Sequence, residues 1–144
     1  MTGGATSPSG AAAGAKRILI LGTGSIAHRH AEHFGSIPGC AVVAACDTNA
    51  ERARAFAALH GIPHAFDNLD AALAWGGFEA VVNATPDQVH KPTTLEILEH
   101  GKAVFCEKPL AIHAADAFEM VAAYHFGSKR TSKSVTVCLS GLIG

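Results

Sequence analysis

The chain has 144 residues, a length that suits one domain and can bury one sizeable hydrophobic core. Hydrophobic residues make up 49% of it and charged residues 16%, a composition that excludes an intrinsically disordered protein. The net charge is −1, there is no basic stripe, and no apolar stretch reaches membrane-spanning length. We therefore expect neither a nucleic acid nor a membrane as partner. Residues 1–15 lack the charged start and apolar core of a secretion signal, so a cytoplasmic location is expected.

From residue 16 onward, strand-like and helix-like segments alternate, which predicts repeated βα units and a parallel sheet. Residues 1–15 are expected to form a flexible tail. We expect an α/β fold with a doubly wound parallel sheet in three αβα layers over residues 16–126. Residues 127–144 form an atypical C-terminal segment that could add one further strand. Strands are predicted near residues 17–21, 41–46, 64–66, 79–84, 103–106 and 135–139, and helices near 25–35, 49–60, 68–75, 90–100 and 113–125. Gly61 and Gly101 follow helical runs as stops, and Asn68 begins one as a cap.

The first predicted strand breaks into Gly22-x-Gly24-x-x-Ala27, and the sequence then turns helical. In this pattern a strand delivers the phosphates of a dinucleotide to the N-terminus of a helix. Gly22 permits the tight turn, Gly24 lets the backbone approach the pyrophosphate, and Ala27 lets the helix pack close to the strand. A plain strand-to-helix turn is the alternative, because glycine-rich turns are common.

The second predicted strand ends at Asp47, about 20 positions after Ala27. That spacing is typical of the acid that binds the adenosine ribose hydroxyls of a dinucleotide. The alternative is a helix cap at the end of a strand. An acid here favours NAD, because the 2′-phosphate of NADP would meet a like charge. Arg52 and Arg54 lie close by in the next predicted helix, so NADP stays open.

The fourth predicted strand leads into Thr85 and Pro86, and His90 stands in the first turn of the following helix. Ligands of open α/β sheets bind at the carboxyl ends of the strands, which places these three residues on the cofactor side. A solvated histidine at the edge of an ordinary helix start is the alternative for His90.

The fifth predicted strand delivers Glu107-Lys108-Pro109 to the same edge. A lysine there can donate to a substrate hydroxyl oxygen or a cofactor ribose, and the proline fixes the backbone that aims it. Taken alone, a surface charge pair before a loop is the simpler interpretation.

Cysteine and histidine patterns indicate no metal site. The four cysteines form no CxxC pair, and three lie in apolar runs, so buried free thiols are expected. Among nine histidines, His28, His30 and His33 share the first predicted helix, but only His30 and His33 lie on one face of it. No HExxH motif accompanies them, and we predict no metal.

As a set, the stretches GTGSIAHRH, CDTNAERA, NATPDQVHKP and GKAVFCEKPLA resemble the Gfo/Idh/MocA family of NAD(P)-dependent oxidoreductases, in order and over roughly residues 16–125. The resemblance implies an N-terminal Rossmann domain and hydride transfer between a nicotinamide and a carbinol carbon, usually of a sugar or polyol. It implies that Lys108 is catalytic and that the cofactor is held by Gly22, Thr23, Gly24, Ser25, Ile26, Asp47, Thr85, Pro86, His90, Glu107 and Lys108.

Members of this family continue into a second, largely antiparallel substrate domain, and we expect this chain to lack it. Residues 127–144 do not resemble the usual passage into that domain. Two functions therefore stay open: a dehydrogenase whose substrate half lies elsewhere, and a nucleotide-binding module or inactive fragment without catalysis. We expect weak NAD(H) binding, little or no turnover, and self-association through apolar surface that the second domain normally covers.

Overall fold

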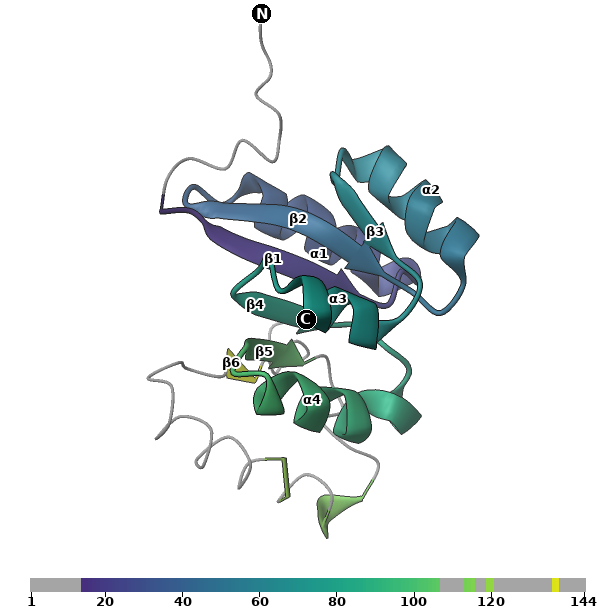
Figure 1. Ribbon diagram of the computed structural model, residues 1–144, viewed down its shortest axis with the longest axis vertical. Coiled ribbons are helices and arrows are strands. Elements are labelled where there is room, and N and C mark those ends of the chain that lie inside the picture. The colour runs from purple at the N-terminus through teal and green to yellow at the C-terminus, as the bar shows by residue number, and fades with distance from the viewer. Residues whose placement is uncertain (1–13, 107–112, 116–118, 121–135, 138–144) are drawn as a thin grey trace, which may run out of the picture.

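A computed structural model describes residues 14–106, 113–115, 119–120 and 136–137, and strands alternate with helices along the chain (Figure 1). The strands are β1 (Lys16–Leu21), β2 (Cys40–Cys46), β3 (His64–Phe66), β4 (Ala80–Asn83), β5 (Ala103–Cys106) and β6 (Thr136–Val137). The helices are α1 (Ser25–Ser36), α2 (Ala50–His60), α3 (Leu69–Trp75) and α4 (His90–Glu99), with a single 3₁₀ turn, η1 (Asp87–Val89), directly before α4.

The strands form one sheet in the order β3-β2-β1-β4-β5-β6, and every neighbouring pair is parallel. The chain moves outward from β1 to β3, crosses back to β4, and moves outward on the other side to β6. The direction of winding reverses between β1 and β4. Sheets of this topology bind ligands at that reversal, outside the carboxyl ends of the strands. The predicted doubly wound parallel sheet is confirmed.

Helices cover both faces of the sheet (Figure 1). On one face, α1 and α2 pack over a buried cluster that includes Ile18, Ile20 and Val82. On the other, α3 and α4 pack over a cluster that includes Leu19, Val81 and Val104. The strands are continuous apolar runs because alternate side chains enter different cores. This arrangement confirms the three αβα layers.

The helix ends follow the local chemistry of the sequence. The Asn68 side chain accepts a hydrogen bond from the Ala71 amide at 2.7 Å and caps α3, as predicted. Asn49 caps α2 in the same way through the Arg52 amide. Gly61 ends α2 in the left-handed region, with φ of 66°, and Gly101 follows α4 with φ of 73°.

Several expectations concern parts of the chain beyond the described residues. These are the tail over residues 1–13, most of the predicted helix at 113–125, the thiol of Cys138, and Glu107 and Lys108. Of the strand expected at 135–139, β6 is described, and it pairs in parallel with β5. Cys46 and Cys106 are buried and form no disulfide, as expected, whereas Cys40 is half-buried. Among the helices that the structure describes, none is long and apolar enough to cross a membrane.

Candidate functional site

The glycine turn after β1 is held between the ends of three strands. Gly22 has φ of +89°, and a Cβ built on it would lie 2.7 Å from the Ala84 carbonyl oxygen at the end of β4. The Gly22 amide donates to the Cys46 carbonyl oxygen of β2 at 2.8 Å. Only glycine fits this position, because a side chain would meet both backbone strain and a backbone atom. The turn thus lies where the winding of the sheet reverses.

The N-terminus of α1 opens onto free space. Gly24 is its N-cap and supplies no side-chain cap, and there is no acidic residue in the first turn. A Cβ built on Gly24 would have only the Arg52 guanidinium near it, at 3.8 Å. Uncapped amides and the positive end of the helix dipole favour an anion at such a place. Buried Ala27 lets α1 lie close against the sheet.

Asp47, at the end of β2, is bonded to the glycine turn. Its Oδ2 accepts hydrogen bonds from the Thr23 hydroxyl at 2.6 Å and the Thr23 amide at 3.0 Å, and its Oδ1 accepts from the Asn49 amide at 2.9 Å. The helix-cap alternative for Asp47 is wrong, because the N-cap of α2 is Asn49. The carboxylate instead connects the end of β2 to the loop that precedes α1.

The electrostatics keep this carboxylate ionised. Burial alone would raise the pKa of Asp47, but the hydrogen bonds from Thr23 and Asn49 and the positive charge of Arg52 together lower it below its usual value. The Arg52 guanidinium lies 3.9 Å from Asp47 Oδ2 and is half exposed. Beside them, burial raises the pKa of the Cys46 thiol to about 12, and the charges of Asp47 and Asp67 add to the rise. Cys46 is therefore a neutral group.

The loop between β4 and α4 rests on a buried polar network. Asn83 is fully buried, and its side-chain oxygen accepts from the Thr85 hydroxyl at 2.6 Å. Its amide donates to the hydroxyls of Thr93 and Thr94 at 2.8 and 3.0 Å. His90 is also fully buried, and its Nε2 lies 2.7 Å from the Thr85 carbonyl oxygen. All of these groups lie at the carboxyl end of β4 and the start of α4.

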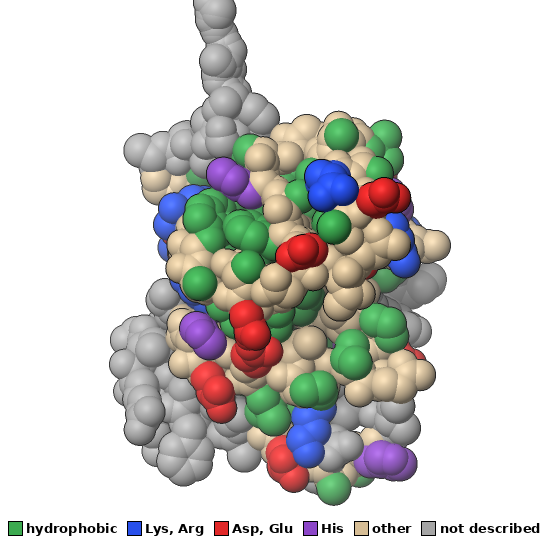
Figure 2. All heavy atoms as spheres, turned by 45° about the vertical axis from the view of Figure 1, so that its right-hand side comes forward, with side chains coloured by type: hydrophobic (Ala, Val, Ile, Leu, Met, Phe, Trp, Pro, Cys, Tyr) green, Lys and Arg blue, Asp and Glu red, His purple; other side chains and the backbone are tan. Residues whose placement is uncertain are grey.

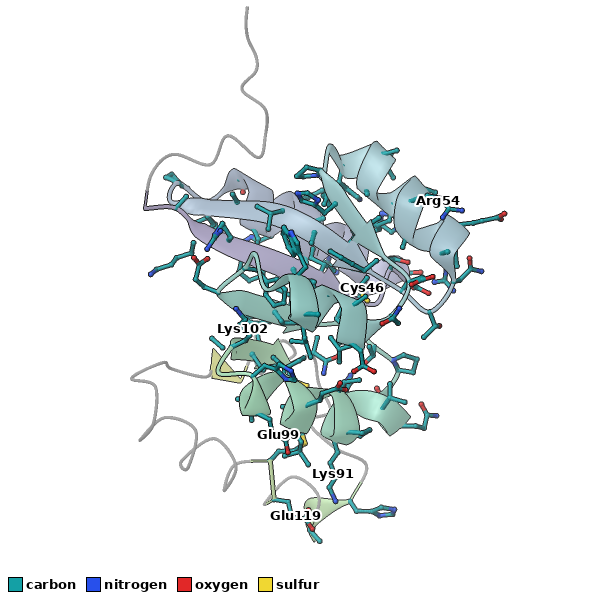
Figure 3. All side chains as sticks on the ribbon, in the orientation of Figure 1. Cys46, Arg54, Lys91, Glu99, Lys102 and Glu119 are labelled. Atoms are coloured by element: carbon teal, nitrogen blue, oxygen red, sulfur yellow. The ribbon has the colours of Figure 1, made fainter. Side chains whose placement is uncertain are left out.

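These elements surround one cavity of about 540 Å³ at the carboxyl edge of the sheet. Figure 3 shows Cys46 at this edge, at the end of β2, whereas Arg54 projects from α2 away from the sheet. On the face that Figure 2 shows, basic side chains lie singly among acidic and apolar ones. The cavity is lined by Leu21, Gly22, Thr23, Gly24, Cys46, Asp47, Thr48, Arg52, Asn68, Leu69, Ala84, Thr85, Pro86, Val89 and Thr93.

The cavity brings together part of the predicted site. Among the predicted cofactor residues it gathers Gly22, Thr23, Gly24, Asp47, Thr85 and Pro86. Ser25 and Ile26 are exposed at the start of α1, and His90 is buried behind the cavity wall. Glu107 and Lys108 directly follow Cys106, the last residue of β5, and lie outside the described residues.

Other lining residues were not predicted. Asn68 and Leu69 follow β3, and strand-end reasoning applied to that strand could have found them. Val89 and Thr93 enter through the 3₁₀ turn and the first turn of α4. No sequence pattern signals that turn, because its position depends on how the loop after β4 folds back over the sheet.

A Gly22 turn, an uncapped helix N-terminus and an acid at the end of the second strand, all facing one cavity, define a nucleotide-binding α/β domain. The family model described as an oxidoreductase family with an NAD-binding Rossmann fold matches residues 16–134. The chain belongs to this family, the Gfo/Idh/MocA oxidoreductases, and corresponds to its NAD-binding domain.

Two relatives illustrate the match. The scyllo-inositol 2-dehydrogenase (NADP(+)) IolU of Bacillus subtilis is 38% identical over 107 residues, which are 74% of this chain and 33% of that protein. The mouse trans-1,2-dihydrobenzene-1,2-diol dehydrogenase is 36% identical over 110 residues, 75% of this chain and 33% of that one. The chain thus spans about a third of the length of the relatives it matches.

Solved structures agree. The WlbA dehydrogenase of Bordetella pertussis in complex with NADH and UDP-GlcNAcA superposes with a TM-score of 0.76 at 31% identity, covering 79% of this chain and 35% of that one. An oxidoreductase from Agrobacterium radiobacter in complex with NAD+, L-tartaric acid and magnesium gives a TM-score of 0.76 at 26% identity, covering 78% and 33%.

Proposed function

We propose that this chain binds NAD(H) in the cavity between β1, β2 and β4 and that it is the cofactor half of a hydride-transferring oxidoreductase. The observation that carries the proposal is the convergence of the Gly22 turn, the N-terminus of α1 and the Asp47 carboxylate on one cavity. The space in front of Gly24 suits a phosphate, which supports the fit of a dinucleotide. Two similar structures, described above, contain NAD+ or NADH.

The proposed contacts follow from position. Backbone amides of residues 24–26 hold the pyrophosphate at the start of α1, because the Gly22 and Thr23 amides already donate to the Cys46 carbonyl oxygen and to Asp47. Asp47 accepts a hydrogen bond from a hydroxyl group of the adenosine ribose. A carboxylate can accept about four hydrogen bonds, and Thr23 and Asn49 donate three of them here, so one position is left for the ribose. Thr85 and Pro86 form the wall on the nicotinamide side.

Lys108 is the proposed catalytic residue. Cys106, the last residue of β5, is in register with Asn83 of β4, so β5 ends at the same edge of the sheet as β4, and Lys108 comes two positions later in the sequence. A lysine ammonium group can donate a hydrogen bond to the hydroxyl oxygen of a sugar-like or polyol-like substrate, and Glu107 precedes it in the sequence. A nicotinamide cofactor, when bound, supplies the hydride chemistry.

A second function is a nucleotide-binding module without turnover. The chain spans about a third of the length of its dehydrogenase relatives. Hydride transfer needs the substrate carbon held against the nicotinamide, and such positioning contributes about 7–11 kcal/mol in favourable systems. We propose that the chain alone binds cofactor, turns over little, and self-associates, which light scattering would detect. Steady-state oxidation of a polyol by the purified chain would contradict this second function.

The test of cofactor binding is a titration of the purified chain with NADH, followed by cofactor fluorescence. Asp47→Ala should weaken binding at least tenfold, because it removes both the ribose contact and the bond to the glycine turn. Asp67→Ala is the matched control, since Asp67 follows β3 and lines a different, smaller cavity. Absence of saturable binding to the wild-type chain would refute the proposal, as would equal binding by the two variants.

A further inference from the structure

We propose that His90 is a positioning residue for the cofactor site: buried behind the loop of residues 85–89, it fixes that loop as the wall of the cavity on the nicotinamide side. The inference rests on the proposed NAD(H) site and deepens it. The family resemblance placed His90 among the cofactor contacts, and the sequence predicted it in the first turn of the helix that follows the fourth strand. In the structure its side chain is fully buried, and it is not among the residues that line the cavity.

The hydrogen-bond partner of His90 shows that its Nε2 is a donor. His90 Nε2 lies 2.7 Å from the carbonyl oxygen of Thr85, five residues earlier. A carbonyl oxygen only accepts, so Nε2 must carry the hydrogen and donate it. This side-chain bond joins His90, the first residue of α4, to Thr85, the first residue of the loop, and so ties the two ends of the loop together.

Further hydrogen bonds hold the two ends of the loop. The Thr85 hydroxyl and amide both donate to the Asn83 side-chain oxygen, at 2.6 and 3.3 Å. At the far end, the Val89 amide donates to the Pro86 carbonyl oxygen at 3.0 Å, and the Val89 carbonyl oxygen accepts from the Thr93 hydroxyl at 2.5 Å. Asn83 and Thr93 are themselves joined at 2.8 Å. The loop is therefore held by hydrogen bonds at both of its ends.

Two apolar residues of the loop face the cavity. Pro86 and Val89 line the cavity, and Val89 is one of the large apolar side chains that remain exposed, at 37%. The hydrogen bonds between Thr85 and Asn83 hold the backbone, while Pro86 and Val89 give the cavity wall an apolar surface beside Thr85. Such a surface suits the flat ring of a nicotinamide, provided that the backbone behind it does not move.

The test compares His90→Gln with His90→Leu in the 144-residue chain. A glutamine keeps a side-chain N–H donor for the Thr85 carbonyl oxygen, whereas a leucine fills space and leaves that carbonyl without it. Ile97→Val is the control, because it trims a buried side chain of the same helix on its core side, away from the loop. Amide hydrogen exchange of residues 85–89 and the Kd for NADH are measured for each.

We expect His90→Leu to raise exchange in the loop and the Kd for NADH by roughly tenfold each, and His90→Gln to restore both to within about threefold of wild type. Ile97→Val should leave both unchanged relative to the wild-type chain. Unchanged exchange in His90→Leu, or equal changes in His90→Leu and Ile97→Val, would overturn the role of His90. A wild-type chain that fails to bind NADH would refute the proposed function instead, and the exchange data would still decide whether His90 holds the loop.

Discussion

The hydroxyl of Thr23 donates to Asp47 Oδ2 at 2.6 Å, and the amide of the same residue donates to the same oxygen at 3.0 Å. Thr23, which lies between the first two glycines of the motif, is therefore hydrogen-bonded to the acid at the end of β2. The loop that faces the cavity and the acid expected to bind ribose are one connected unit. A change in either one should alter the other.

Replacing Thr23 by valine tests this connection. Thr23→Val keeps the shape of the side chain and removes the hydroxyl that bonds to a nearly buried carboxylate, so we expect a loss of about 1–3 kcal/mol in the free energy of unfolding. The pKa of Asp47 should rise towards its ordinary value, because a bond that favours the ionised form is gone. Chemical denaturation and a carboxyl NMR titration measure the two effects. Thr48→Val, an exposed position in the same segment, is the control and should change neither.

A methyl group on Gly22 should be tolerated poorly. Gly22→Ala forces a positive φ on a side-chain-bearing residue and places a Cβ 2.7 Å from the Ala84 carbonyl oxygen, so we expect a loss of about 1–3 kcal/mol in stability and weaker NADH binding. Gly35→Ala, in α1 with nothing within 4 Å of the new Cβ, should instead stabilise the chain by about 0.5–1 kcal/mol. Thermal melts of both variants decide, and a Gly22→Ala chain as stable as wild type would show that the turn adapts.

The sequence predicted most helices and strands well, because their boundaries depend on residues that are close together along the chain. The apolar runs of β1 and β4, the Asn68 cap and the Gly61 stop each depend on neighbours within a few residues. The cavity position of Asp47 followed from its spacing along the chain. The orientation of His90 could not be predicted, because helix start and strand end place the residue but tertiary packing decides whether its ring faces the cavity or the core.

The contact between His28 and His60 lay outside any sequence pattern for the same reason. His28 Nδ1 lies 2.8 Å from His60 Nε2, and both rings pack on Phe56, with centroids 4.8 and 4.6 Å away. The two helices that carry them, α1 and α2, meet only in the folded chain. Two histidines on different helices can meet in this way only because both helices pack on the same face of the sheet.

This pair should make stability depend on pH near neutrality. Burial lowers the pKa of His60, and the neighbouring His28 lowers it further, although Glu32 acts in the opposite direction. The folded chain then binds fewer protons than the unfolded chain, so the free energy of unfolding should fall as pH drops below about 6.5, the ordinary value for histidine. Urea denaturation between pH 7.5 and about 5 measures the slope. His60→Gln should flatten it, while an exposed histidine replaced in the same way, His33→Gln, should not; identical slopes in all three chains would refute the assignment.

Arg52 should determine how well the chain tolerates the 2′-phosphate of NADP. Its guanidinium lies 3.9 Å from Asp47 and 3.8 Å from the position of a Cβ on Gly24, so it offsets part of the negative charge of Asp47, the proposed ribose ligand. We expect the wild-type chain to prefer NADH, because Asp47 repels a phosphate there. Arg52→Gln should weaken NADPH binding about tenfold and NADH binding much less.

Arg54→Gln is the matched control, since Arg54 is on the same helix but lines the smaller cavity. Parallel fluorescence titrations with both cofactors give the ratio of affinities, and a ratio that Arg52→Gln leaves unchanged would place the 2′-position away from this guanidinium.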